Sequence, residues 1–151
     1  DLIVVMKDGV VQQIGKPQDV YDEPVNLFVA KFLGTPPINV FEGSVKAGKL
    51  YIGEAVVSEA ADIADQEVYI AVRPEGFVLQ EEGPLCCKFS GVEVMGRDIS
   101  VISTHPSCEN AVIRSIISAE NKVDMQAEEV RFALKPKKVF VFSKDSGNRL
   151  N

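Results

Sequence analysis

The sequence predicts a mainly β fold, a small antiparallel barrel or sandwich preceded by an N-terminal β-hairpin and one or two short helices. Two observations carry this prediction. From Asn39 onward, short runs of β-branched and aromatic residues alternate with glycine, proline and asparagine, which is typical of small all-β domains. Before Asn39 the pattern is one hairpin followed by helical periodicity. We therefore divide the chain into residues 1–38 and a β domain of residues 39–151.

The chain opens with two apolar runs, Leu2–Met6 and Val10–Ile14, on either side of the dipeptide Asp8-Gly9. Asp-Gly between apolar runs is the strongest short-range hairpin signal. Pro17 then suits the first turn of a short helix, since its missing N–H would be unpaired there in any case. Pro24 ends that helix or begins the next one.

A second helix is predicted from an apolar stripe with the spacing i, i+3, i+4, i+7 and i+8. Gly34 and two prolines close it. An aromatic stripe of this kind is usually a core or an interdomain face, so we interpret the segment as a docking helix. Its stripe consists of Val25, Phe28, Val29, Phe32 and Leu33.

The β domain contains nine candidate strands. In the last candidate, Val139–Phe142 is apolar on both faces, which suits a central strand. Residues 54–66 are either a helical turn or an acidic loop. The candidates are Phe41–Lys46, Lys49–Ile52, Glu67–Arg73, Phe77–Leu79, Cys86–Met95, Asp98–Ser103, Ala111–Ile117, Glu128–Leu134 and Lys138–Phe142.

The stretch GSVKAGKLY, residues 43–51, comes within one residue of a phosphate-binding loop. Two glycines and Lys49 match the pattern G-x-x-x-x-G-K-[ST], but Leu50 stands where a hydroxyl should reach magnesium. The aromatic and β-branched residues that follow are poor at beginning a helix. We interpret the stretch as a hairpin with Ala47-Gly48 at its tip and expect it not to bind ATP.

Composition limits the class of partner and compartment. The net charge is −6, which argues against nucleic acid or an anionic lipid surface as the main partner. The longest apolar run is five residues, too short to span a bilayer. The opening residues lack the pattern of a signal peptide. Together these features lead us to expect a cytosolic protein.

Cysteine and histidine offer one candidate reactive pair. Cys86 and Cys87 are adjacent and form neither a disulfide framework nor a C-x-x-C metal pair, so we expect reduced thiols. His105 lies three residues before Cys108 in THPSCEN. Proline, serine and asparagine mark this stretch as a turn without further ligands nearby, and we favour a structural role over a nucleophilic or metal site.

Four stretches of the chain carry a family resemblance. They are LIVVMKDGVVQQIGKPQDVYDEPVNLFVAKFLGTPPIN, YIAVRPEGFVL, GVEVMGRDISV and KKVFVFSKDSGNRL. In this order, and over nearly the whole chain, they resemble ATP-binding cassette ATPase subunits of bacterial sugar importers, the maltose-importer type. In that family the first run ends the nucleotide-binding domain, and a C-terminal regulatory domain with a transport-associated OB fold follows.

The resemblance implies that Arg73, Pro74 and Glu75 form the family's motif at a strand end, and that Gly96 lies within a later strand pair. It places the P-loop, the signature helix, the acidic metal site and the switch histidine upstream of this chain, so His105 is not that histidine. The chain would then have no catalytic, cofactor-binding or metal-binding residues of its own. ATP and Mg²⁺ would bind in the full-length parent.

The first hypothesis is therefore a regulatory and dimerisation domain of an importer ATP-binding subunit, for sugars or polyols. The expected partners are a second copy, the membrane permease subunits (through the missing domain) and a regulatory protein or small ligand. The expected location is cytoplasmic, on the inner face of the membrane. The solute would be chosen by the permease and its binding protein.

Two other function classes remain open. Asn39 and Gly43 keep the spacing found in related OB-fold domains that bind small oxyanions, although prolines replace the residues that normally precede the asparagine and so remove donors. This alternative is a small-oxyanion or small-ligand module that regulates transport. An independent enzyme would rest on the Cys108–His105 pair alone.

The N-terminal hairpin would pack inside the missing domain and is otherwise an apolar surface with an unpaired edge. We expect it to dock on a second copy or on the chain's own barrel, with the face formed by Phe28 and Phe32 buried beside it.

Overall fold

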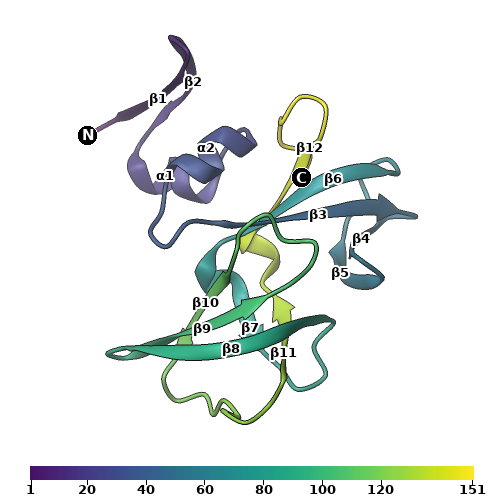
Figure 1. Ribbon diagram of the computed structural model, residues 1–151. Coiled ribbons are helices and arrows are strands. Elements are labelled where there is room, and N and C mark those ends of the chain that lie inside the picture. Colours follow the sequence, from purple (N-terminus) through teal and green to yellow (C-terminus); the bar gives the residue numbers. More distant parts are fainter.

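The computed structural model describes all 151 residues. An N-terminal hairpin and two short helices precede a β domain of two five-stranded antiparallel sheets (Figure 1). No helix of the structure is long and apolar enough to cross a membrane. The first four elements are β1 (Ile3–Lys7), β2 (Val10–Gly15), α1 (Pro17–Asp22) and α2 (Leu27–Phe32).

The first sheet has the strand order β12-β6-β3-β4-β5 and the second β10-β9-β8-β11-β7. Two 3₁₀ turns, η1 (Pro74–Gly76) and η2 (Pro136–Lys138), precede β7 and β12. The strands are β3 (Asn39–Lys46), β4 (Lys49–Ile52), β5 (Ala55–Glu59), β6 (Gln66–Val72), β7 (Phe77–Leu79), β8 (Leu85–Met95), β9 (Asp98–Thr104), β10 (Ile113–Ser118), β11 (Glu129–Leu134) and β12 (Val139–Ser143). The predicted mainly β, OB-like class with a hairpin and two helices is confirmed.

One core lies between the two sheets, and a second apolar layer lies outside the first sheet. Strand β6 shows how the sequence builds both. Val68 and Ile70 point into the core between the sheets, whereas Tyr69 and Ala71 belong to a cluster with Ala30 of α2. Successive side chains of a strand point to opposite faces, so β6 is apolar on both because α2 covers the outer one.

Strand β12 corrects one prediction. The run Val139–Phe142 is buried on both faces as expected, but β12 is an edge strand and not a central one. The C-terminal tail folds back along its free edge, where Leu150 N donates to Val141 O at 2.8 Å and Ser143 N donates to Asn148 O at 2.9 Å. The tail therefore covers the edge that a neighbouring strand would have covered.

The prediction for residues 54–66 was also wrong. The segment is neither a helical turn nor merely an acidic loop, because its first half forms strand β5, which pairs with β4 across a register shift at Leu50/Tyr51. Only Val57 is buried near its centre. A short edge strand with a single buried residue leaves too weak an alternation to be recognised in the sequence.

The Ala47-Gly48 hairpin is confirmed. Lys46 and Lys49 pair across a two-residue turn, and both turn residues have positive φ, 49° for Ala47 and 76° for Gly48, as a type I′ turn requires. Gly43 lies in the middle of β3, where a Cβ atom would collide with the Ile70 side chain and the Tyr51 carbonyl. The near-match to a phosphate loop is therefore strand, turn and strand.

The docking helix is shorter than predicted. The Asn26 side chain accepts a hydrogen bond from Val29 N at 2.9 Å and caps the helix, which begins at Leu27. Val25 lies outside the helix and is exposed, and Phe32, the last residue of the helix, is 60% exposed. The buried face consists of Val29 and Ala30. The predicted stripe was too long because Asn26, the N-cap of the helix, has a non-helical conformation and lies between Val25 and the rest of the stripe.

The N-terminal hairpin packs on the helices. Val5 of β1 forms a buried cluster with Val20 of α1 and Val29 of α2, and Phe28 packs at the edge of this cluster. Its outer face remains exposed, and the hairpin extends away from the β domain (Figure 1). Docking on the chain's own barrel was thus the wrong expectation. Docking on a second copy stays a prediction.

Candidate functional site at the junction of helices and barrel

The strongest candidate site lies where the helices meet the β domain, around Arg73. This residue follows β6 and is fully buried. Its Nη2 donates to Tyr21 O at 2.7 Å, and its Nη1 donates to Ala30 O and Leu33 O at 3.0 Å each. Two of these carbonyls lie in the last turns of α1 and α2, and the third belongs to Leu33, the residue that caps the C-terminal end of α2. Backbone carbonyls at a helix end have no partner within the helix. One side chain thus holds both helices onto the barrel.

Electrostatics favour a cation at this point. The carbonyl end of a helix carries partial negative charge, and the Arg73 guanidinium also stacks 3.9 Å from the centre of the Tyr21 ring. Burial lowers the pKa of Arg73, and the neighbouring Tyr21 and Glu75 act in the opposite direction. The Nε atom alone has no partner. The group is therefore held by carbonyls and a ring, without a direct ion pair.

A second polar link runs beside the first. The Tyr21 hydroxyl donates to Glu75 at 2.7 Å, and burial, followed by this hydrogen bond, raises the pKa of Tyr21. Lys138 Nζ lies 3.5 Å from Glu75 and 3.7 Å from Asp22. Pro74 opens the turn η1, which carries Glu75 two residues after the buried arginine. The three family-motif positions are thus brought together at one interface.

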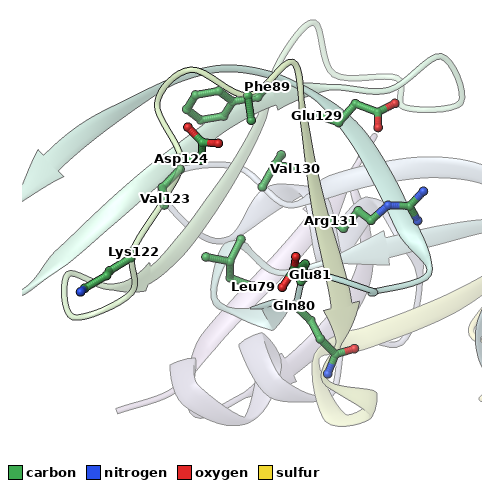
Figure 2. Close-up of a pocket in the computed structure, with 11 residues that line it drawn as sticks. Leu79, Gln80, Glu81, Phe89, Lys122, Val123, Asp124, Glu129, Val130 and Arg131 are labelled. Carbon is green, nitrogen blue, oxygen red and sulfur yellow. The ribbon is translucent and has the colours of Figure 1, made fainter.

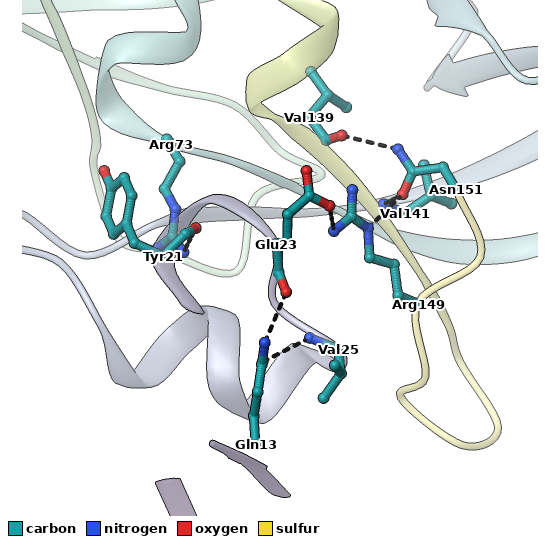
Figure 3. Close-up of polar contacts among 9 residues, drawn as sticks. All are labelled: Gln13, Tyr21, Glu23, Val25, Arg73, Val139, Val141, Arg149 and Asn151. Atoms are coloured by element: carbon teal, nitrogen blue, oxygen red, sulfur yellow. Dashed lines mark hydrogen bonds and ion pairs between the residues drawn. The ribbon is translucent and has the colours of Figure 1, made fainter. Parts of the chain in front are cut away.

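The C-terminal tail completes the junction (Figure 3). Arg149 forms an ion pair with Glu23 at 2.7 Å, and its backbone N–H donates to Val25 O at 3.0 Å. The Asn151 amide bonds to the backbone of β12 at Val139 and Val141. The end of the chain therefore ties the linker between α1 and α2 to the edge of the first sheet.

Beneath these polar contacts lies an apolar layer. Six buried side chains pack together with partly buried Leu27 and Tyr69. They come from α2, from the segment between α2 and β3, and from three strands. They are Ala30, Ile38, Val40, Ala71, Phe140 and Phe142. Because this layer excludes water, the hydrogen bonds of Arg73 act in a low-dielectric setting.

The other predicted positions lie apart from this site. Gly96 has a φ of 79° and occupies the turn between β8 and β9. Of the predicted docking stripe, Val29 is buried, while Phe28 and Leu33 are half-buried against the hairpin. Their role as a docking face for another domain remains a proposal.

Sequence reasoning missed Tyr21, Lys138 and Arg149. Tyr21 and Glu75 are 54 residues apart, and Arg149 and Glu23 are 126 apart. No spacing rule relates residues so distant, and only the pairing of strands brings them together.

The Cys–His pair is structural in its contacts. His105 Nδ1 accepts a hydrogen bond from Ser107 N at 3.0 Å, its ring packs edge-on to Phe41, and burial lowers its pKa. Burial raises the pKa of Cys108, whose thiol lies 3.7 Å from Asn110 Oδ1. A thiol kept protonated is a poor nucleophile. No group of three or more His, Cys, Asp or Glu side chains is arranged to hold a metal ion.

Asn39, one of the two oxyanion positions, is buried and bonded within the chain. Its Nδ2 donates to Val72 O and Arg114 O, and its Oδ1 accepts from Arg114 N. With Gly43 packed tightly between strands, these two residues join strands in this fold.

No protein-family model matches the chain. It is 30% identical to an sn-glycerol-3-phosphate import ATP-binding protein of Jannaschia sp. (strain CCS1), over 99% of this chain and 42% of the relative. It is also 30% identical to a diacetylchitobiose uptake system ATP-binding protein of Streptomyces coelicolor, over 99% of this chain and 46% of the relative. An ABC transporter ATP-binding protein of Escherichia coli O157:H7 is 33% identical over 68% of this chain and 31% of its own length.

The chain thus spans less than half the length of the relatives that match it almost throughout. The match extends across both the helical segment and the β domain, as expected for a C-terminal portion of such a subunit. The chain belongs to the ATP-binding subunits of ABC importers, and it corresponds to part of such a subunit.

Proposed function

We propose that this chain is the regulatory and dimerisation portion of the ATP-binding subunit of a bacterial importer for sugars or polyols. In this proposal the barrel self-associates, and the helical segment connects it to a nucleotide-binding domain that contacts the permease. The subunit would then lie in the cytoplasm, on the inner face of the membrane. Relatives named for sn-glycerol-3-phosphate import and diacetylchitobiose uptake support the choice of solute class.

The observation that carries the proposal is the buried Arg73 bonded to the last turns of both helices. A regulatory domain must move with the segment that connects it to the catalytic part. A single side chain that satisfies three carbonyls at the ends of two helices makes the barrel and this segment one mechanical unit.

We further infer that this portion does not hydrolyse ATP by itself. Phosphoryl transfer needs a phosphate cradle that opens into a helix, together with magnesium ligands. The stretch that comes closest to such a cradle is the tight hairpin between β3 and β4. A nucleotide titration followed by amide NMR tests this inference, because saturable shifts near Lys49 would overturn it.

Solution mass, measured by light scattering over a wide concentration range, tests self-association. We expect a dimer for the full chain and for the double variant Ile14→Lys/Phe32→Glu, which places charge on the exposed hairpin and helix face. A dimer lost in that variant would assign association to this face. Monomers throughout would remove dimerisation from the function and leave ligand sensing as the leading role.

A further inference from the structure

A cavity lies between strands β7, β8 and β11 of the second sheet and the loop that precedes β11, away from the junction. Its volume is about 520 Å³, within the range of sites that bind small molecules. In Figure 2 the loop that carries Lys122 and Asp124 faces strands that carry Leu79 and Val130. The cavity thus has a wall of rigid strands and a wall of loop.

The floor of the cavity is apolar. Leu79, Phe89 and Val123 are half-buried and pack against the barrel core, and Val130 belongs to that core. Phe89 provides the only aromatic ring among the lining residues. This floor offers one ring and three aliphatic side chains, which suits a ligand with a flat apolar side.

The rim of the cavity is polar and contains both donors and acceptors. Glu81 and Asp124 supply carboxylates, Gln80 an amide and Lys122 an ammonium group. None of these charges takes part in an ion pair of the chain. Asp124 Oδ1 accepts from Gln126 N at 2.9 Å, which holds the loop and leaves Oδ2 free of protein hydrogen bonds.

We propose that this cavity binds a neutral carbohydrate or polyol. Such a ligand has an apolar C–H side for the floor and hydroxyls that both donate and accept at the rim. Among the charged side chains of the rim, the carboxylates of Glu81 and Asp124 outnumber the single ammonium group of Lys122, which disfavours phosphate esters. Lys122 in turn disfavours a polycation.

A ligand here can be sensed at the junction. Leu79 of the floor ends β7, and this strand directly follows the turn η1 that carries Glu75. Glu75 accepts the hydrogen bond from Tyr21 of α1. The ligand class deepens the proposed regulatory function, whereas binding itself can be tested whether the chain is a monomer or a dimer.

The test is an amide NMR titration of the full chain with glucose, N-acetylglucosamine and maltose. We expect saturable shifts at Leu79, Phe89 and Val130 for at least one sugar. Glu81→Gln and Asp124→Asn should each weaken binding by about tenfold, the effect of losing a hydrogen bond to a charged group. The control Glu82→Gln changes an exposed neighbour outside the cavity and should leave binding unchanged.

Three results would overturn the proposal. One is the absence of saturable shifts up to about 20 mM sugar, well above the millimolar dissociation constants of weak sites. Another is sugar binding that the Glu81 and Asp124 variants leave unchanged. The third is tighter binding of glycerol 3-phosphate or spermidine than of any neutral sugar, which would replace the ligand class.

Discussion

The barrel interior and the junction are held together by different physical means. In the barrel, 22 buried residues from both sheets form one apolar cluster, and its stability comes from surface removed from water, an effect without direction. At the junction, six buried apolar residues lie beside a guanidinium whose hydrogen bonds point at three particular carbonyls. The barrel therefore depends on volume and pattern, whereas the junction depends on the geometry of one side chain.

The first way to break this contrast is to open a cavity in the barrel. Phe132 is fully buried, with its ring edge-on to Phe77 at 5.2 Å. Phe132→Ala should lower the free energy of unfolding by about 3–5 kcal/mol, measured by urea denaturation. The control Val78→Ala, on an exposed neighbour in β7, should cost less than about 1 kcal/mol. A comparable loss in both variants would mean that the core is not the main source of barrel stability.

The second way to break the contrast is to remove the arginine at the junction. Arg73→Ala leaves three carbonyls without their donor and should destabilise the helical segment by about 3 kcal/mol. Hydrogen exchange should show α1 and α2 opening while the barrel strands stay protected. Arg73→Lys should restore little, since an ammonium group cannot reproduce the planar fork.

Arg131→Ala is the matched control. This exposed arginine donates to one carbonyl, Gly83 O, and its loss should leave exchange in both helices unchanged. If Arg73→Ala instead lowers protection equally in the helices and the barrel, the two regions unfold as one cooperative unit and the contrast between them fails.

The same difference explains what the sequence could predict. Alternation and turn residues located nine of the ten strands of the β domain, because each is encoded within a few neighbouring residues. The weakly patterned strand β5 was missed. Burial of β12 was evident, but its edge position was not, since the tail that covers it is recognisable only once Asn151 lies against Val139 and Val141. Arg73 was singled out by family resemblance, and its carbonyl partners could not have been inferred from spacing.

A third prediction uses pH to sharpen the contrast from the barrel side. Burial raises the pKa of Cys87 to about 12. Above about pH 8.5, the ordinary thiol pKa, the unfolded chain loses this proton while the folded chain keeps it. The unfolded state then binds fewer protons, so the free energy of unfolding falls by about 1.4 kcal/mol per pH unit for this thiol.

Denaturation at pH 8, 9 and 10 measures this slope. Cys87→Ala should flatten it more than Cys86→Ala, because Cys86 is only half-buried, although its pKa is also raised by burial. Equal slopes in the wild type and Cys87→Ala would show that the thiol reaches water in the folded state.

The smallest expected effect isolates the second link of the junction. Tyr21→Phe keeps the ring that stacks on Arg73 and removes only the hydroxyl that donates to Glu75. The loss should be about 1 kcal/mol, detected as faster amide exchange in α1. Tyr69→Phe, in which a half-buried tyrosine without a hydroxyl hydrogen bond is altered, should change nothing there.

Because Glu75 also faces Lys138, the variant Tyr21→Phe/Glu75→Gln distinguishes two arrangements. A double loss equal to the sum of the single losses would mean that tyrosine and lysine hold the helix independently, whereas a smaller loss would mean that Tyr21 acts through the carboxylate, the arrangement that the geometry favours.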